Sequence, residues 1–252
     1  MATANHQYAV IAGSGFQAFG ESAKAHQLTT DYGEPSSLLR ELQFGERVVF
    51  LLARHGERLT IPPHRINYRA NLAALKTLDV KSIVALNTVG VITAGRHPGE
   101  ISIPGQVIDY TYGRDHSFYD GEMDNLDHIE FTEPFSERLR QELRVAAQVS
   151  GIAVHDGGVY AAMQGPRLET TAEVNRLDRD GADYVGMTAM PEASLARELD
   201  LDYACLSLIV NYAAGRSDNA IHADIEASTT TARTQAMRIL QGLFQGTGPE
   251  DS

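Results

Sequence analysis

The stretch YVGMTAMPEASLARELDLDYACLSLIV, residues 184–210, decides the fold of this 252-residue chain. Its pattern predicts a strand at 184–187, a helix at 191–198 and a second strand at 203–210. Both strand segments are nearly continuous in apolar character, which is typical of strands that are covered on both faces of a sheet. The stretch therefore indicates a layered α/β fold, in which helices alternate with the strands of a central sheet.

The same alternation extends along the rest of the chain. Apolar runs predict further strands at 8–12, 48–53, 83–86, 106–108 and 158–162, and helical periodicity predicts helices at 68–78, 137–150, 170–180 and 225–244. Thr170 and Glu173 form a capping-box pattern at the start of one helix, and Gly151 is a stop signal after another. We expect a single three-layer α/β domain over residues 1–252, with a frayed polar tail at 246–252.

Composition excludes several classes of function. The chain carries 21 Lys and Arg against 33 Asp and Glu, a formal net charge of −12, which argues against nucleic-acid and anionic-membrane partners. A local pocket can still attract a small anion. No apolar run approaches the ~20 residues of a membrane span, and the N-terminal residues do not resemble a signal peptide, so we expect a cytoplasmic protein. The single cysteine, Cys205, excludes an intramolecular disulfide, and its apolar neighbours predict a buried, inert thiol.

Glycines and polar residues follow four of the predicted strands. The segments are Gly13-Ser14-Gly15, Arg54-His55-Gly56, Asn87-Thr88-Val89-Gly90 and Gly186-Met187-Thr188. In open α/β sheets the carboxyl ends of the strands meet in the crevice that binds ligands, and glycine turns, hydroxyls and an arginine fork are typical of phosphate sites. A dinucleotide fingerprint in the first segment is disfavoured, because Ala18 stands where the third glycine is needed. A structural turn without a ligand also remains open.

Two further residues could recognise a planar ring. Glu169 directly precedes a predicted helix, where the helix dipole favours an ionised carboxylate. Asn211 follows an apolar strand and can offer both a donor and an acceptor. Together they suit a heterocycle with one N–H donor and one carbonyl, while a helix-start role and a turn-capping role stay open. The sequence holds no HExxH, G-x-S-x-G or Walker motif, so we predict neither a metal nor a covalent nucleophile.

Nine segments resemble the trimeric purine nucleoside phosphorylase and methylthioadenosine phosphorylase family. They are VIAGSG, LLARHG, RINYRANLAALK, LNTVGVI, DYTYGRDHSFYDG, HIEFTEPF, YAAMQGPRLETTAEV, YVGMTAMPEASLARE and YACLSLIVN. The resemblance implies a central mixed sheet flanked by helices and a glycosyltransferase (pentosyltransferase) reaction of purine salvage, in which phosphate attacks C1′ of the ribose. It also implies a homotrimer in which His128 reaches a neighbour's site, which would explain the long polar stretch 108–135.

The resemblance also implies roles for individual residues. Phosphate would be held by Ser14, Arg54, His55, Thr88 and Thr188. Met187 would contact the ribose, while Leu168 and Val89 would line the base pocket. Asn211 would donate to the purine N7, and Glu169 would accept from N1–H, so these two would be the catalytic pair. No cofactor is implied beyond inorganic phosphate as a co-substrate.

The identity of the substrate depends on two positions. The SFYDG and NYRAN segments resemble the methylthioadenosine branch, whose members typically carry Ser and Asp where this chain has Glu169 and Asn211. The Glu–Asn pair is that of 6-oxopurine enzymes, and a carboxylate facing the bare N1 of adenine would cost about 1–3 kcal/mol. The 5′ substituent depends on whether His222, or an apolar neighbour at 221 or 223, occupies its pocket.

The combination favours phosphorolysis of S-methyl-5′-thioinosine to hypoxanthine and 5-methylthioribose 1-phosphate. Methylthioadenosine phosphorolysis and inosine or guanosine phosphorolysis are the alternatives within the same class of enzyme. A catalytically silent nucleoside-binding protein is the alternative from another class, because fold does not fix function.

Overall fold

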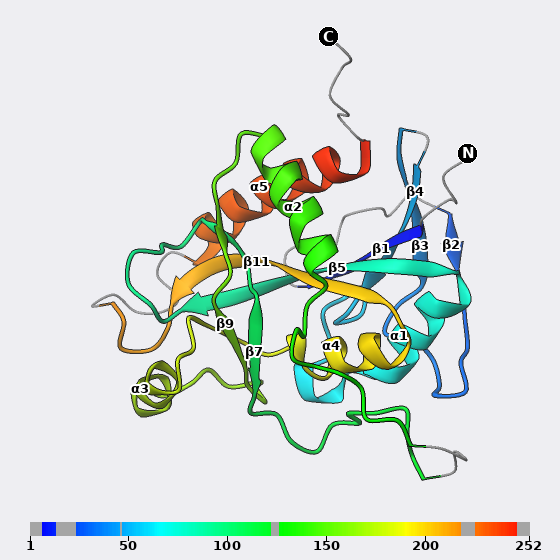
Figure 1. Ribbon diagram of the computed structural model, residues 1–252, viewed down its shortest axis with the longest axis horizontal. Helices are drawn as coiled ribbons and strands as arrows, with labels where there is room; N and C mark the ends of the chain where they lie inside the picture. The colour runs from blue at the N-terminus through cyan, green and yellow to red at the C-terminus, as the bar shows by residue number, and fades with distance from the viewer. Residues whose placement is uncertain (1–6, 14–23, 46, 122–125, 218–224, 246–252) are drawn as a thin grey trace.

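The computed structural model describes residues 7–13, 24–45, 47–121, 126–217 and 225–245. Within these residues, eleven strands form one mixed sheet (Figure 1). The strands are β1 (Gln7–Ala12), β2 (Ala25–His26), β3 (Leu39–Phe44), β4 (Arg47–Ala53), β5 (Val80–Val91), β6 (Ile101–Ile103), β7 (Gln106–Asp109), β8 (Val154–Asp156), β9 (Val159–Ala162), β10 (Tyr184–Gly186) and β11 (Asp202–Tyr212). β1 is parallel to β4 and to β5, and β5 is parallel to β11, whereas β10 is antiparallel to β5.

Helices cover both faces of the sheet. α2 (Glu137–Val149) and α5 (Ile225–Gln245) lie on one face, and α1 (Tyr68–Thr77) and α4 (Ala189–Glu198) lie on the other (Figure 1). α3 (Thr171–Arg179) packs over β9 and β10 through Val174 and Leu177. The short 3-10 turn Pro63–Arg65 precedes α1. The three-layer α/β architecture with a mixed sheet is thus confirmed.

Alternate residues of the central strands enter different cores. In β1, Ala9 and Ile11 join the apolar cluster that contains Leu72 of α1, whereas Val10 joins the cluster that contains Leu240 of α5. Successive side chains of a strand point to opposite faces of its sheet. A strand with a helix layer on each face is therefore apolar at nearly every position, which is the pattern that the sequence shows.

The structure confirms the five predicted helices to within two residues at each end, and all seven predicted strands are present. The Thr170 hydroxyl accepts from the Glu173 backbone while the Glu173 carboxylate accepts from the Thr170 backbone, so the capping box is present as predicted. Gly151 follows α2 with a φ of +66°, a left-handed conformation that suits a glycine stop. Four strands were not predicted: β2, β3, β6 and β8. The tail 246–252 lies outside the described residues.

The predicted ends of two strands are wrong. β5 continues to Val91, so Asn87 and Gly90 lie inside it, and β11 continues to Tyr212, so Asn211 lies inside that strand. The two strands pair with each other over this whole extension. Backbone hydrogen bonding between them therefore carries both strands past the polar residues that would suggest a turn.

Candidate active site

A cavity of about 240 Å³ opens where the pairing of β5 is interrupted. One edge of β5 pairs with β1 as far as Ala85 and with β10 from Gly90 onward. The residues between these two points leave a gap in the sheet, next to the end of β1. Nine of the predicted site residues line the cavity: Arg54, His55, Thr88, Val89, Leu168, Glu169, Met187, Thr188 and Asn211. The other lining residues are Gly13, Pro63, Asn87, Gly90, Pro166, Val185, Gly186 and Val210.

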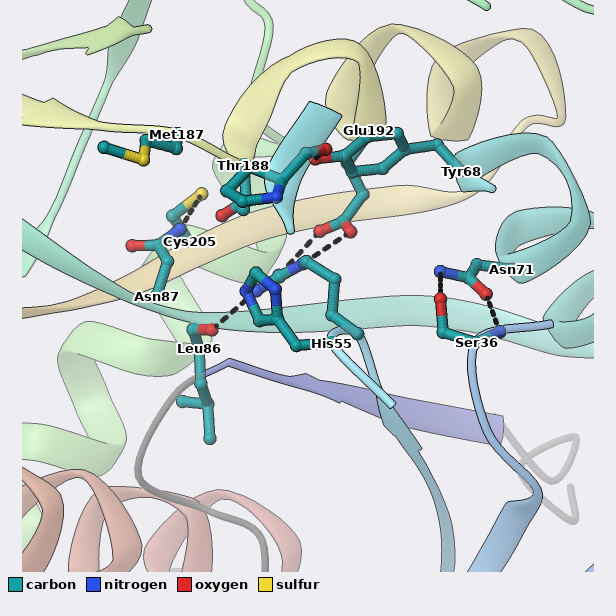
Figure 2. A network of polar contacts seen from close by, with 12 residues as sticks. Ser36, His55, Tyr68, Asn71, Leu86, Asn87, Met187, Thr188, Glu192 and Cys205 are labelled. Atoms are coloured by element: carbon teal, nitrogen blue, oxygen red, sulfur yellow. Dashed lines mark hydrogen bonds and ion pairs between the residues drawn. The ribbon is translucent and has the colours of Figure 1, made fainter. Parts of the chain in front are cut away.

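Arg54, just beyond β4, is fully buried at this cavity. Its Nε and Nη2 each donate to the Glu192 carboxylate at 2.8 Å, and its Nη1 donates to the Leu86 carbonyl at 3.1 Å (Figure 2). Leu86 lies in the gap between β1 and β10, so the guanidinium satisfies a carbonyl that has no neighbouring strand on that side. Burial alone would lower the pKa of Arg54, but the Glu192 carboxylate outweighs burial and raises it. One N–H on each of Nη1 and Nη2 remains beyond these three bonds.

Glu192 is absent from the predicted site residues, yet it holds the charge of Arg54. Its side chain is fully buried on α4, and the Tyr203 hydroxyl donates to its Oε2 at 2.8 Å. The signal that could have found it is its position on the helix, because Ala189, Glu192 and Ala196 share one buried face. A carboxylate on such a face is almost never left without a partner.

His55 lies beside Arg54 and is half-buried. Its Nδ1 is 2.8 Å from the carbonyl oxygen of Ile61. A carbonyl only accepts, so the ring proton sits on Nδ1 and Nε2 is left as the acceptor of the neutral ring. Burial and the charge of Arg54 lower the pKa of His55, and they outweigh the Ile61 carbonyl and Glu192, which raise it. The imidazole is therefore mostly neutral at neutral pH.

Glu169 and Asn211 reach the same cavity from the segment before α3 and from β11. Burial raises the pKa of Glu169, and its neighbour Arg167 is bound to the Glu173 carboxylate, at 2.7 and 2.8 Å. The Nδ2 of Asn211 donates to the Tyr212 carbonyl at 2.7 Å, which leaves one amide N–H and the side-chain carbonyl for a ligand. Both site groups thus keep polar atoms that can recognise a ring.

The backbone near Asn211 is irregular. The register of β11 against β5 shifts between Ile209 and Asn211, so Val210 is an extra residue on one strand. Such bulges bend a strand and re-aim the side chains that follow. The bulge therefore contributes to the direction of the Asn211 carboxamide at the gap in the sheet.

The lining residue Met187 packs closely on Gly165, which directly precedes the lining residue Pro166. A Cβ at Gly165 would lie 2.5 Å from the Met187 sulfur, and Gly165 has a φ of +62°. Only glycine fits both the close approach and the left-handed backbone. Gly165 therefore positions Met187 beside the segment that carries Leu168 and Glu169.

Two threonines supply hydroxyls to the cavity wall. Thr188 is only 5 % exposed at the N-terminus of α4, and its side chain makes no capping hydrogen bond there. Thr88 lies in the part of β5 that pairs with β11 on one edge and with neither β1 nor β10 on the other. Val89 and Leu168 add apolar surface, and Leu168 remains 40 % exposed. The cavity therefore combines hydroxyls, a guanidinium and an imidazole with apolar walls.

Three predicted site residues are not among the described residues that line this cavity. His128 is exposed and does not line the cavity of its own chain. Ser14 and His222 lie outside the described residues. The roles expected of these three residues stay predictions.

Arg114 is a second residue that the predicted site lacks. It comes from the long segment after β7 and is 9 % exposed. Its Nη1 donates to the carbonyls of Met187 and Met190 at 2.8 and 2.6 Å, and its Nη2 to those of Met163 and Gln164 at 3.2 and 2.8 Å. It thereby ties two cavity-lining segments together. No pattern in the sequence indicates these contacts, because all four acceptors are backbone atoms.

The sequence model of the Phosphorylase superfamily matches residues 7–245. The chain belongs to this superfamily. Among its relatives, a probable S-methyl-5′-thioinosine phosphorylase from Pseudomonas syringae pv. tomato is 48 % identical over 217 residues, which cover 85 % of this chain and 88 % of that protein. A 6-oxopurine nucleoside phosphorylase from Pyrococcus furiosus is 41 % identical over 224 residues, covering 86 % of this chain and 84 % of that protein.

A comparison with solved structures also finds nucleoside phosphorylases among the proteins similar to this superfamily member. A mutant adenosine/methylthioadenosine phosphorylase from Schistosoma mansoni, in complex with methylthioadenosine, aligns with a TM-score of 0.89 and 31 % identity. The alignment covers 98 % of this chain and 93 % of that chain. The resemblance to nucleoside phosphorylases that the nine sequence segments indicate is confirmed.

Three further observations on this phosphorylase-superfamily protein concern metal binding, membrane-spanning helices and its single cysteine. In the part of the chain that the structure describes, no three His, Cys, Asp or Glu side chains gather in a group that could hold a metal ion. None of the described helices is long and apolar enough to span a bilayer. Cys205 is buried as predicted, and burial raises the pKa of its thiol to about 12.

Proposed function

We propose that this member of the phosphorylase superfamily cleaves a purine nucleoside with phosphate, and that S-methyl-5′-thioinosine is its preferred substrate. The products are hypoxanthine and 5-methylthioribose 1-phosphate. The observation that carries the proposal is that one cavity joins Arg54 and His55, which suit an anion, to Glu169 and Asn211, which suit a heterocycle. The names of the relatives from Pseudomonas syringae and Pyrococcus furiosus support the same class of reaction.

Phosphate binding uses the polar end of the cavity. The proposed ligands are the free N–H groups of Arg54, the His55 ring, and the hydroxyls of Ser14, Thr88 and Thr188. A phosphate oxygen attacks C1′ as the bond from C1′ to the purine nitrogen breaks, and the electron pair of that bond leaves with the base. No side chain becomes covalently attached, so the protein contributes positioning and electrostatic stabilisation.

The leaving base is stabilised at the other set of residues. Negative charge grows on the purine as the glycosidic bond breaks, and the remaining N–H of Asn211 donates to N7. Glu169 accepts from N1–H of a 6-oxopurine. Met187 contacts the ribose, and Leu168 and Val89 line the base pocket.

The substrate follows from the Glu169–Asn211 pair. A carboxylate matches the N1–H of hypoxanthine, whereas against the bare N1 of adenine it places an acceptor against an acceptor. Methylthioadenosine is the second candidate, because the structural neighbour from Schistosoma mansoni was solved with that nucleoside. At the 5′ end, Ile221 or Ala223 in the pocket would suit a methylthio group, and His222 there would suit a hydroxyl.

We further propose a cytoplasmic homotrimer that acts in purine salvage, with His128 of each chain reaching a neighbour's cavity. Its exposed position away from its own cavity is compatible with that role. Light scattering would measure the assembly. Trimers mixed from His128→Ala chains and Arg54→Met chains should be more active than either pure assembly, because some cavities would then combine intact residues. Activity no higher than that of the pure variants would contradict the shared site.

The deciding experiment compares three nucleosides. Phosphate-dependent release of free base from methylthioinosine, methylthioadenosine and inosine is measured side by side and ranked by kcat/KM. Preference for methylthioinosine is expected. Preference for methylthioadenosine would contradict the role of Glu169, and preference for inosine would assign His222 to the 5′-hydroxyl. Binding of hypoxanthine without cleavage of any of the three would support a silent binding protein instead.

A further inference from the structure

We propose that the phosphate end of the cavity selects an oxyanion that still carries a proton, and that Nε2 of His55 is the acceptor for that proton. The inference rests on the proposed function, because it concerns the anion-binding part of the same site. Hydrogen phosphate and hydrogen arsenate each keep an acidic O–H at neutral pH, whereas sulfate keeps none. The site should therefore accept the first two anions and discriminate against sulfate.

The orientation of the His55 ring is fixed by two reciprocal hydrogen bonds with Ile61. Nδ1 donates to the Ile61 carbonyl at 2.8 Å, and the Ile61 N–H donates to the His55 carbonyl at 3.1 Å. Nδ1 is thus occupied, and Nε2 has no hydrogen-bond partner within the described part of the chain. The neutral ring can offer a ligand in the cavity only this lone pair. A P–O–H group can donate to it, and a fully ionised oxygen cannot.

The charges at this end of the cavity do not offset such a mismatch. Arg54 is the only Lys or Arg among the described lining residues, and the fully buried Glu192 carboxylate balances its charge. The segments 14–23 and 218–224, which lie outside the described residues, contain no Lys or Arg in their sequence. An anion in this cavity of one chain is therefore held by individual hydrogen bonds rather than by excess positive charge. Under these conditions the single contact between the Nε2 lone pair of His55 and an anionic oxygen of the ligand decides which anion is preferred.

The groups that face His55 keep the ring neutral. They are Arg54 and Glu192, together with the Ile61 carbonyl, and Glu169 is the other titratable side chain among the described lining residues. Burial and Arg54 dominate and lower the pKa of His55. In acid the ring gains a proton, Nε2 becomes a donor, and the barrier against sulfate should disappear. Sulfate itself does not change charge over this range, so any change in its binding reports on the protein.

The test is displacement of radiolabelled phosphate from the full-length protein, without nucleoside, by arsenate and by sulfate. At about pH 8 sulfate should displace phosphate at least about tenfold less well than arsenate, because an unmatched buried acceptor typically costs that much. Phosphate and arsenate themselves titrate as the pH is lowered, so the pH dependence is measured as direct binding of radiolabelled sulfate, which should strengthen as the imidazole gains its proton. His55→Gln should lose both the selectivity and its dependence on pH, because an amide can turn a donor toward sulfate.

Two controls separate His55 from other groups. His155→Gln removes a half-buried histidine that is bound to Glu100 away from the cavity, and it should behave as the wild type does. Glu169→Gln removes the other titratable group, and the sulfate profile should keep its dependence on pH. If His55→Gln does not fold, the wild-type sulfate profile still decides. Equal displacement by sulfate and arsenate at about pH 8 overturns the inference, and so does a profile that His55→Gln leaves unchanged.

Failure of this inference is distinguishable from failure of the proposed function. If phosphate releases base from nucleosides while sulfate competes as well as arsenate, only the selectivity is wrong. If no nucleoside is cleaved while sulfate is still rejected in favour of arsenate, the anion site stands and the proposed reaction is wrong.

Discussion

Exchange of Glu169 for glutamine should move the enzyme from 6-oxopurines toward 6-aminopurines. The side chain lines the cavity, and its neighbour Arg167 is bound to Glu173. The carboxylate is therefore available to the base without a competing ion pair. A hydrogen bond to a charged group contributes about 1.5–3 kcal/mol. Its loss from the transition state predicts that kcat/KM for methylthioinosine falls about ten- to 150-fold.

Adenine nucleosides should respond in the opposite direction. A glutamine amide can donate to the bare N1 of adenine, where the carboxylate of Glu169 presents only acceptors. We therefore expect kcat/KM for methylthioadenosine to stay constant or rise, and the KM for phosphate to change little. The assay follows base release from both nucleosides at saturating phosphate. Glu41→Gln, which alters a carboxylate on β3 away from the cavity, is the matched control and should leave the ratio of the two substrates unchanged. Equal losses on the two nucleosides would refute the assigned role of Glu169.

Three further results are expected. Burial raises the pKa of Glu169, so its carboxyl gains a proton at a higher pH than an ordinary glutamate does. As the pH is lowered, kcat/KM for methylthioinosine should therefore fall before kcat/KM for methylthioadenosine falls. Parallel pH profiles for the two nucleosides would contradict this. Gly165→Ala places a Cβ against the Met187 sulfur and should destabilise the wall by about 1–3 kcal/mol, raising the nucleoside KM more than the phosphate KM in steady-state kinetics. Glu192→Gln leaves Arg54 buried without its counter-charge and should lower the free energy of unfolding in urea by about 3–5 kcal/mol; a loss below about 1 kcal/mol would show that the pair contributes little.

The elements that the sequence predicts well are those with a strong local pattern. α3 begins at a capping box formed by Thr170 and Glu173, and α2 ends just before Gly151, so both boundaries are marked within a few residues. The strands β2, β6 and β8 are two or three residues long, too short to show a period of their own. β3 reads LRELQF and places Arg40 and Glu41 in mid-strand. Such strands depend on their pairing partners rather than on their own composition.

The candidate site divides in the same way. Arg54, His55 and Thr188 follow apolar strands directly, so their position at one edge of the sheet can be predicted from the chain alone. The contacts of Glu192 and Arg114 join segments far apart in the sequence, and no local pattern specifies them. The cavity itself arises from an interruption of pairing along β5, which depends on where β1 ends and β10 begins. Register of this kind is a property of the assembled sheet.

The interrupted pairing along one edge of β5 also explains how Arg54 can both stabilise the fold and bind the ligand. A gap in the sheet leaves the Leu86 carbonyl without a neighbouring strand, and a buried acceptor must be satisfied. Arg54 satisfies it with one N–H of Nη1, and Glu192 balances the charge. The two N–H groups that remain are the second one on Nη1, which also binds Leu86, and the second one on Nη2, which also binds Glu192. An arginine held in this way cannot reorient without losing three hydrogen bonds at once. Its free donors are therefore fixed before phosphate arrives, which is the condition for electrostatic preorganisation. A lysine at this position would keep the charge but could not make the fork, so Arg54→Lys should impair the fold and the phosphate KM together.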